Sequence, residues 1–206
     1  MRKPVIIGIA GGTASGKTTL AKKIKEEFKD EAIILSHDFY YKSLTDITKE
    51  EREKRNYDCP EAYETDLMIT QIKELINGKT IHRPVYSYIE RLREDKKVIV
   101  EPVPIIIIEG MLVLENEELN SLMDIKVFVD TDDDIRLIRL IERDTKERGL
   151  NIEYIMEKYK STLKPMYEKY VKPCKEKADI IISGDDINNG AEMIINTVNN
   201  NYKICT

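Results

Sequence analysis

Residues 11–18 read GGTASGKT, so two glycines separated by four residues come directly before Lys17 and Thr18. Glycines at these places let the backbone curl until successive amide groups point inward at phosphate oxygens. A lysine next to them can bridge the outer phosphates, and the following hydroxyl can bind Mg²⁺. The spacing predicts a phosphate-binding loop formed by Gly11, Gly12, Thr13, Ala14, Ser15, Gly16, Lys17, Thr18 and Thr19.

Two carboxylates follow other apolar segments. Glu109 ends the run IIIIE, and Asp38 comes shortly after the run AIILS. If both runs are parallel strands, both acids overhang the carboxyl edge of the sheet, where ligands bind. We therefore predict a metal site from Thr18, Asp38 and Glu109, with Asp38 as the base for an acceptor hydroxyl in phosphoryl transfer. The alternative for Glu109 is a solvated acid at a strand end.

Arginines recur in the segment RLIRLIERDTKERG at spacings of three and four residues. This spacing predicts one face of a helix, with leucine and isoleucine on the opposite face. A helix of this kind after a phosphate loop favours a mobile lid that closes on the nucleotide, with arginines that stabilise the migrating phosphoryl group. A solvated charged face is the alternative. The predicted arginine face is Arg136, Arg139 and Arg143, and the opposite face is Leu137, Leu140 and Ile141.

The elements that must position these residues alternate along the chain. Short apolar runs predict strands at 5–10, 32–36, 104–110, 124–130 and 178–183. Helical patterns begin near Lys17 and at the Thr48–Glu51 capping box, and they also cover 66–77, 151–171 and 188–200. Pro165 is expected to bend or break its helix. The alternation predicts an α/β fold of the P-loop NTPase type, with a doubly wound parallel sheet and helices on both faces.

One domain over residues 1–206 is the simplest organisation, because the chain has no repeat and no low-complexity linker. Within it, residues 79–101 predict an inserted β-hairpin for the acceptor, with TIHRPVYSY and KKVIVEP joined by the charged IERLRED. Pro84 suggests an exposed edge. Residues 132–165 would form the lid and the helix after it.

Composition excludes several classes of protein. The net charge is −5, whereas duplex nucleic-acid binders carry a basic excess. The scattered Cys59, Cys174 and Cys205 favour a reducing compartment and exclude a cysteine-built zinc site. No apolar stretch approaches the length of a membrane span, and no signal peptide is visible. We expect a cytoplasmic domain with no nucleic-acid or membrane partner.

A GTP-dependent switch protein would share the phosphate loop, but it should also carry N-K-x-D for guanine, which this chain lacks. A kinase is therefore favoured over a switch. From another class, a regulatory protein that binds ATP with little turnover remains an alternative, although Asp38 and the arginine helix argue against it. A sensor needs no base for an acceptor.

Seven segments together resemble the uridine kinase family, which belongs with phosphoribulokinase in one wider group. The resemblance runs in order from about residue 4 to 190. The segments are GIAGGTASGKTT, SHDFYYKS, NYDCPEAYETDLM, PVYSYIERLR, IIIIEGMLVL, VFVDTDDDIRLIRLIERDTKERG and KPCKEKADIII.

The resemblance implies transfer from ATP or GTP, with Mg²⁺, to the 5′-hydroxyl of uridine or cytidine in pyrimidine salvage, by a homotetramer. It also implies roles for individual positions. Asp38 would be the base and a metal ligand, Tyr57 and Asp58 would bind base and ribose, and the lid arginines Arg143 and Arg148 would touch phosphates. Further acceptor contacts would come from Tyr40, Tyr86, Tyr88, Arg91 and Arg93. Ordinary hairpin packing is the alternative for Tyr86 and Tyr88.

This chain departs from the family pattern mainly where the acceptor is recognised. Cys59 and Arg91 each replace a histidine, Leu140 and Leu150 replace arginines, and Lys158 replaces a glutamine. An arginine at position 91 adds a permanent charge and five donors. The sequence thus leaves open a related small-molecule kinase that acts on a different alcohol, such as one whose charged group meets Arg91.

Overall fold

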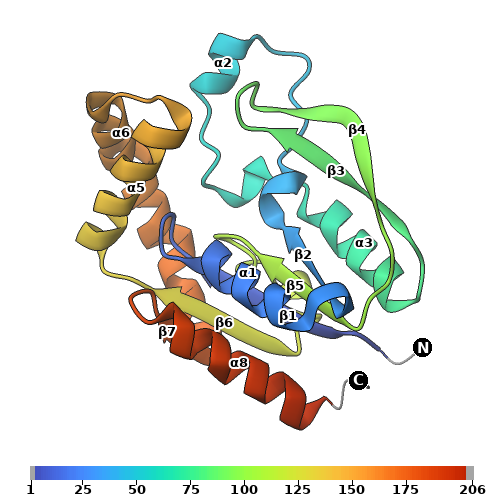
Figure 1. Cartoon of the computed structure of the whole chain (residues 1–206). Coiled ribbons are helices and arrows are strands. Elements are labelled where there is room, and N and C mark those ends of the chain that lie inside the picture. Colours follow the sequence, from blue (N-terminus) through green and yellow to red (C-terminus); the bar gives the residue numbers. More distant parts are fainter. Residues whose placement is uncertain (1–2, 203–206) are drawn as a thin grey trace.

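The computed structural model describes residues 3–202, and Cys205 lies outside this range. Five strands form a parallel sheet in the order β2-β5-β1-β6-β7. All five lie within a residue or two of the segments that the apolar runs predict. Their bounds are β1 Val5–Gly11, β2 Ala32–Ser36, β5 Ile105–Glu109, β6 Ile125–Asp130 and β7 Ile180–Ser183. Figure 1 shows this sheet running through the middle of the molecule.

Helices cover both faces of the sheet, so the doubly wound α/β class is confirmed. Alternate strand residues point to opposite sides and build two apolar cores. One core packs against α1 (Lys17–Phe28) and α8 (Ile187–Asn201). The other core packs against α3 (Thr65–Ile76) and α4 (Glu117–Ser121). No helix in residues 3–202 is both long and apolar enough to cross a membrane.

The strand register brings separate segments to one edge of the sheet. Ile9 of β1 and Ser36 of β2 are both partners of Glu109 of β5. The phosphate-binding loop follows β1, and a 3₁₀ turn at His37–Tyr40 follows β2. Glu109, the loop and Asp38 therefore meet at the carboxyl edge, as expected for an open α/β sheet.

The hairpin β3 (Ile81–Ser87) and β4 (Leu92–Val100) forms a separate two-stranded sheet. Its connection is shorter than predicted, because residues 92–95 are part of β4 rather than of the turn. Charged side chains are compatible with a strand here, since residues 94–97 of β4 are all exposed to solvent. The register shifts between Pro84 and Val85. The predicted capping box opens α2 (Lys49–Glu53) near the hairpin tip.

The lid region consists of α5 (Asp133–Arg148), which ends at Gly149 in the left-handed conformation, and α6 (Ile152–Lys158). The predicted break at Pro165 takes the form of wider turns, since proline cannot donate to the preceding turn. The chain stays helical through a π segment (Tyr159–Leu163), α7 (Lys164–Met166), a second π segment (Tyr167–Val171) and a 3₁₀ segment (Lys172–Lys177).

The predicted apolar face of α5 is confirmed, because Leu137, Leu140 and Ile141 pack in one cluster of the lid, whereas the predicted arginine face is wrong, because Arg136 is buried. The buried stripe of this helix is Arg136, Leu140 and Asp144, spaced by four residues. Leu140 joins Ile155 and Tyr159 in a small apolar cluster of the lid. A buried arginine and aspartate at helical spacing cannot be distinguished from surface residues by hydrophobic periodicity alone.

Candidate active site

The phosphate-binding loop runs from the end of β1 to the start of α1. Gly16, with φ of 101°, lies directly before the first residue of α1, and few residues other than glycine adopt that angle. Thr131 anchors the loop by donating from Oγ1 to the Ser15 carbonyl at 2.9 Å. The buried Ser15 hydroxyl has no hydrogen-bond partner among the described residues. An unpaired polar group in a glycine-rich loop at a helix N-terminus is suited to a phosphate.

Arg136 packs behind this loop instead of facing open solvent. It is buried, donates from Nε to the Thr131 carbonyl at 3.2 Å, and pairs with Asp133. Its guanidinium lies 3.9 Å from the centre of the Tyr167 ring. A Cβ atom at Gly12 would lie 2.7 Å from Arg136 Nη1, so a side chain at this position would displace the guanidinium. Arg136 therefore has a supporting place beneath the loop.

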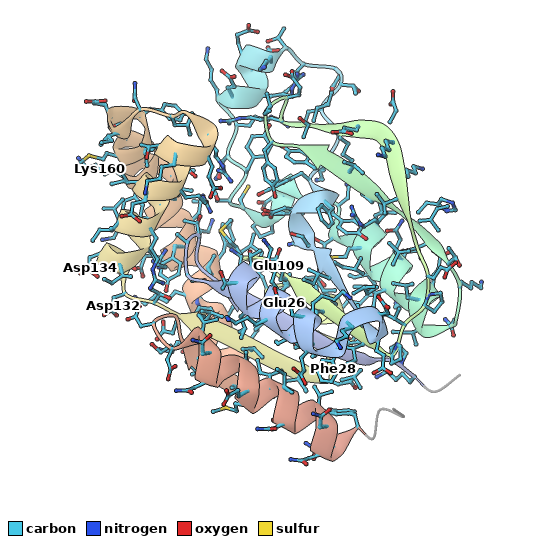
Figure 2. The ribbon with its side chains drawn as sticks, viewed as in Figure 1. Glu26, Phe28, Glu109, Asp132, Asp134 and Lys160 are labelled. Atoms are coloured by element: carbon cyan, nitrogen blue, oxygen red, sulfur yellow. The ribbon has the colours of Figure 1, made fainter. Side chains whose placement is uncertain are left out.

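Thr18 and Glu109 meet at the start of α1. Thr18 Oγ1 donates to Glu109 Oε2 at 3.2 Å, and Glu109 is only 5% exposed. The alternative of a solvated acid is thus wrong. Burial raises the pKa of Glu109 and Lys17 opposes this shift, while the charge of Asp38 adds to it. Figure 2 shows Glu109 in the interior of the molecule, close to α1.

This arrangement fits Mg²⁺ bound together with a nucleotide. Magnesium usually takes one or two carboxylates and fills its other positions with water and phosphate oxygens. In keeping with this, residues 3–202 contain no group of three or more histidine, cysteine or acidic side chains able to hold a metal alone. Thr18 and Glu109 would be the protein ligands, with Asp38 near them.

Asp38 lies in the 3₁₀ turn after β2 and faces the hairpin. Its backbone N–H donates to Ser36 Oγ at 3.4 Å, which orients the turn. One carboxylate oxygen, Oδ2, accepts from the Tyr88 hydroxyl at 3.0 Å. The charge of Asp38 acts on both Glu109 and Asp58, so these three acids share one region of the molecule.

His37, to which no sequence motif assigns a role, supports the same turn. Its ring is buried and stacks on Tyr63 at 4.0 Å, and Nε2 lies 3.2 Å from Thr65 Oγ1. Burial lowers the pKa of His37 to about 3, so the ring is neutral at physiological pH. The stacking on Tyr63 and the contact with Thr65 fix His37, and with it the backbone next to Asp38.

Aromatic rings line the space between Asp38 and the hairpin. Tyr41 stacks on Tyr63 at 4.4 Å, and it also contacts the rings of Tyr57 and Tyr86. Tyr88 packs edge-on against Tyr86 at 5.5 Å. The rings that keep exposed area, Tyr57 and Tyr88, can stack on a flat heterocycle. The structure thus brings the predicted residues Tyr57, Tyr86 and Tyr88 together, and the buried Tyr41 and Tyr63 support them from the core.

Tyr40 does not belong to this surface, and the nucleoside contact predicted for it is wrong. The side chain has no exposed area, and its hydroxyl donates to Gln71 Oε1 at 2.7 Å in the core. Adjacent residues point in different directions here: Tyr40 bonds to Gln71, whereas Tyr41 stacks on Tyr63. The sequence YY alone gives no signal to tell them apart.

Asp58 lies next to the aromatic surface, in the loop before α3. Burial raises the pKa of Asp58, and the strongest opposing charge comes from Lys158 of the lid, with Lys17 and Arg148 also contributing. A carboxylate can accept from both hydroxyls of a vicinal diol. Lys158 and Asp58 therefore face a common region from the lid side and the acceptor side.

The two hairpin arginines have different surroundings. Arg91 is in the left-handed conformation, with φ of 49°; its Nη1 donates to the Glu53 carbonyl at 3.0 Å, and its guanidinium lies 5.7 Å from the Tyr57 ring centre. Arg93 is largely buried and pairs with Glu64 at 2.7 Å. Its Nε and Nη2 lack partners among the described residues. Both lie beside the aromatic surface.

A buried acid that sequence reasoning missed organises the lid arginines. Asp144 accepts from Arg143 Nε at 2.8 Å and lies 3.4 Å from Arg148 Nη1. Arg148 also lies over the Tyr88 ring, 5.5 Å from its centre. Arg139, by contrast, binds the Gly184 carbonyl and Asp185. Of these arginines, Arg148 is the one that reaches the hairpin, through Tyr88.

The geometry divides into two halves: a phosphate loop with Thr18 and Glu109, and an aromatic and acidic surface around Asp38. The profile of the family described as "Phosphoribulokinase / Uridine kinase family" matches residues 6–188. The chain belongs to this family. Family membership makes it a phosphotransferase with the P-loop kinase fold.

Individual proteins agree with this assignment. The chain is 48% identical over 198 residues to a protein named uridine kinase from Streptococcus equi subsp. zooepidemicus, covering 96% of this chain and 95% of that one. It is 49% identical over 181 residues to a uridine kinase from Ligilactobacillus salivarius, covering 87% and 85%. The solved phosphoribulokinase from Rhodobacter spheroides shares the fold, with a TM-score of 0.66 and 18% identity over 89% of this chain and 71% of that chain.

Proposed function

We propose that this family member phosphorylates the 5′-hydroxyl of uridine and cytidine, using ATP or GTP as donor with Mg²⁺. The observation that carries the proposal is the position of Asp38. It lies beside the Glu109–Thr18 pair on one side and contacts Tyr88 of the aromatic surface on the other. The names of the relatives favour uridine over other alcohols and give no support to a different acceptor.

On the donor side, the loop amides, Ser15 and Lys17 would bind the triphosphate. Mg²⁺, when bound with the nucleotide through Thr18 and Glu109, would neutralise phosphate charge. Arg143 and Arg148 would face the migrating group from the lid. Positive charge of this kind dominates catalysis of phosphoryl transfer, because the transition state spreads negative charge over its oxygens.

On the acceptor side, Tyr57 and Tyr86 would border the pyrimidine ring, and Asp58 would accept from the ribose hydroxyls. Arg91 and Arg93 would lie near the edge of the base. Asp38 would orient the 5′-hydroxyl toward the terminal phosphate and accept its proton. The nucleoside gains a phosphate at O5′, and the donor leaves as a diphosphate.

The setting follows from the family resemblance. We propose one domain, with the hairpin as the acceptor insertion and residues 132–165 as the lid, working as a homotetramer in pyrimidine salvage in the cytoplasm. The sedimentation behaviour of the purified protein tests the subunit count.

A direct test offers nucleosides and sugar alcohols with Mg-ATP and scores phosphorylated product in the parent, in Asp38→Asn and in the exposed control Asp46→Asn. We expect uridine and cytidine to be the best acceptors. Asp38→Asn should lose transfer by at least about 100-fold while keeping ATP affinity, and Asp46→Asn should match the parent. Transfer at the parent rate in Asp38→Asn would disprove the base assignment. ATP binding without transfer to any alcohol would favour the regulatory alternative.

A further inference from the structure

Tyr88 stands apart from the other tyrosines of the site. It follows the last residue of β3 at the hairpin tip and is half exposed, whereas Tyr41, Tyr63 and Tyr86 are buried. An exposed tyrosine normally directs its hydroxyl into water. Here the hydroxyl turns inward and donates to Oδ2 of Asp38 at 3.0 Å, joining residues that are 50 positions apart.

Contacts on three sides fix the Tyr88 ring. Tyr86 packs edge-on against it at 5.5 Å with an interplanar angle of 86°. Arg148 lies 5.5 Å from its centre on the lid side, a distance at which a guanidinium is attracted to the ring face. Arg148 is in turn held 3.4 Å from the buried Asp144. The contacts thus run without interruption from the lid, through Tyr88, to Asp38.

We propose that Tyr88 is a positioning residue for the base: its hydroxyl holds Oδ2 of Asp38 so that Oδ1 is left to the acceptor hydroxyl, and Arg148 couples this arrangement to the lid. The inference rests on the proposed function for its acceptor. Its chemistry differs from a role in reading the pyrimidine, because a hydroxyl that donates to Asp38 has no proton left for a base carbonyl.

Holding one oxygen of a carboxylate fixes the direction of the other, and small errors in that direction are costly: displacement of a reacting group by 1 Å can lower the rate roughly 100-fold.

The test compares Tyr88→Phe, which removes only the hydroxyl, with Tyr154→Phe, which removes the hydroxyl of a half-exposed tyrosine on α6. We expect Tyr88→Phe to lower kcat roughly 10- to 100-fold and by the same factor for uridine and cytidine. KM for both nucleosides, the calorimetric Kd for Mg-ATP and the unfolding midpoint should stay near the parent values. Tyr154→Phe should match the parent in every measurement.

Two results would overturn the inference. A change in the uridine-to-cytidine ratio with kcat preserved would assign the hydroxyl to reading the base, and unchanged kinetics would leave it no role. Failure of the proposed function has a different signature, since the parent itself would then transfer no phosphate to nucleosides. If Arg148 acts through Tyr88, Arg148→Lys should lower kcat by a smaller factor in the Tyr88→Phe background than in the parent. Equal factors would overturn the coupling between the lid and Asp38.

Discussion

Thr18 Oγ1 donates to Glu109 Oε2 at 3.2 Å, although the two residues are 91 positions apart in the chain. One belongs to the phosphate loop and the other ends a fully buried strand. The pair joins the α1 N-terminus to β5 at the sheet edge. A hydroxyl beside a buried carboxylate, next to Lys17, is the part of the site that most directly predicts a cation bound with phosphate.

Glu109→Gln should raise the unfolding midpoint and lower kcat. Because burial raises the pKa of Glu109 above its unfolded value, the ionised form costs stability, and stability falls as pH rises through that window. The amide removes this cost at neutral pH. We expect an unfolding midpoint higher by a few degrees, since about 1 kcal/mol shifts it by roughly 2–4 °C, together with at least about 100-fold lower kcat.

Calorimetric scans between acid and neutral pH would check this. The stabilisation should shrink toward acid pH, where Glu109 is protonated in both states. The control is Glu101→Gln, an exposed acid whose neutralisation should change neither property. A Glu109→Gln protein that is less stable than the parent at neutral pH would contradict the argument.

Asp144→Asn should loosen both lid arginines at once. The amide keeps the shape of the side chain but loses the charge that holds Arg143 and Arg148. We expect kcat to fall roughly 10-fold, with a higher KM for ATP, in steady-state assays. The matched control is Glu142→Gln, an exposed acid on the same helix. Equal kcat and KM values for the two variants would mean that Asp144 does not position Arg143 and Arg148 for catalysis.

Arg91→His should raise turnover with uridine and cytidine. Arg91 is tied to the Glu53 carbonyl and places a permanent charge beside Tyr57. Histidine tolerates the left-handed backbone at this position and can be neutral. A gain of up to about 10-fold in kcat/KM corresponds to roughly one hydrogen bond. Arg91→Lys, which keeps the charge, is the control, and an unchanged preference among acceptors in Arg91→His would refute the idea.

Much of the fold follows from the sequence because its signals are local. Apolar runs of five or six residues between helical patterns locate the strands, and the glycine spacing locates the loop at the first strand-to-helix turn. The positions of Glu109 and Asp38 follow from topology, since parallel strands end at the same edge. The capping box at Thr48 and Glu51 is equally local, and the structure forms it.

Features that depend on three-dimensional packing could not be predicted in this way. Tyr40 and Tyr41 are identical neighbours, yet one bonds to Gln71 and the other stacks on Tyr63 beside the hairpin tyrosines. Arg136 and Asp144 are buried because they find partners, which periodicity does not record. The first four residues of β4 look like a charged turn, and only pairing with β3 makes them a strand.

The hairpin β3–β4 shares no backbone ladder with the five-stranded sheet within residues 3–202. Changes along it leave the strand register beneath the phosphate loop untouched. Substitutions in the hairpin can therefore change which alcohol binds without changing the loop that binds the triphosphate. Arg91, one of the residues at which this chain departs from the family pattern, lies in the turn between β3 and β4.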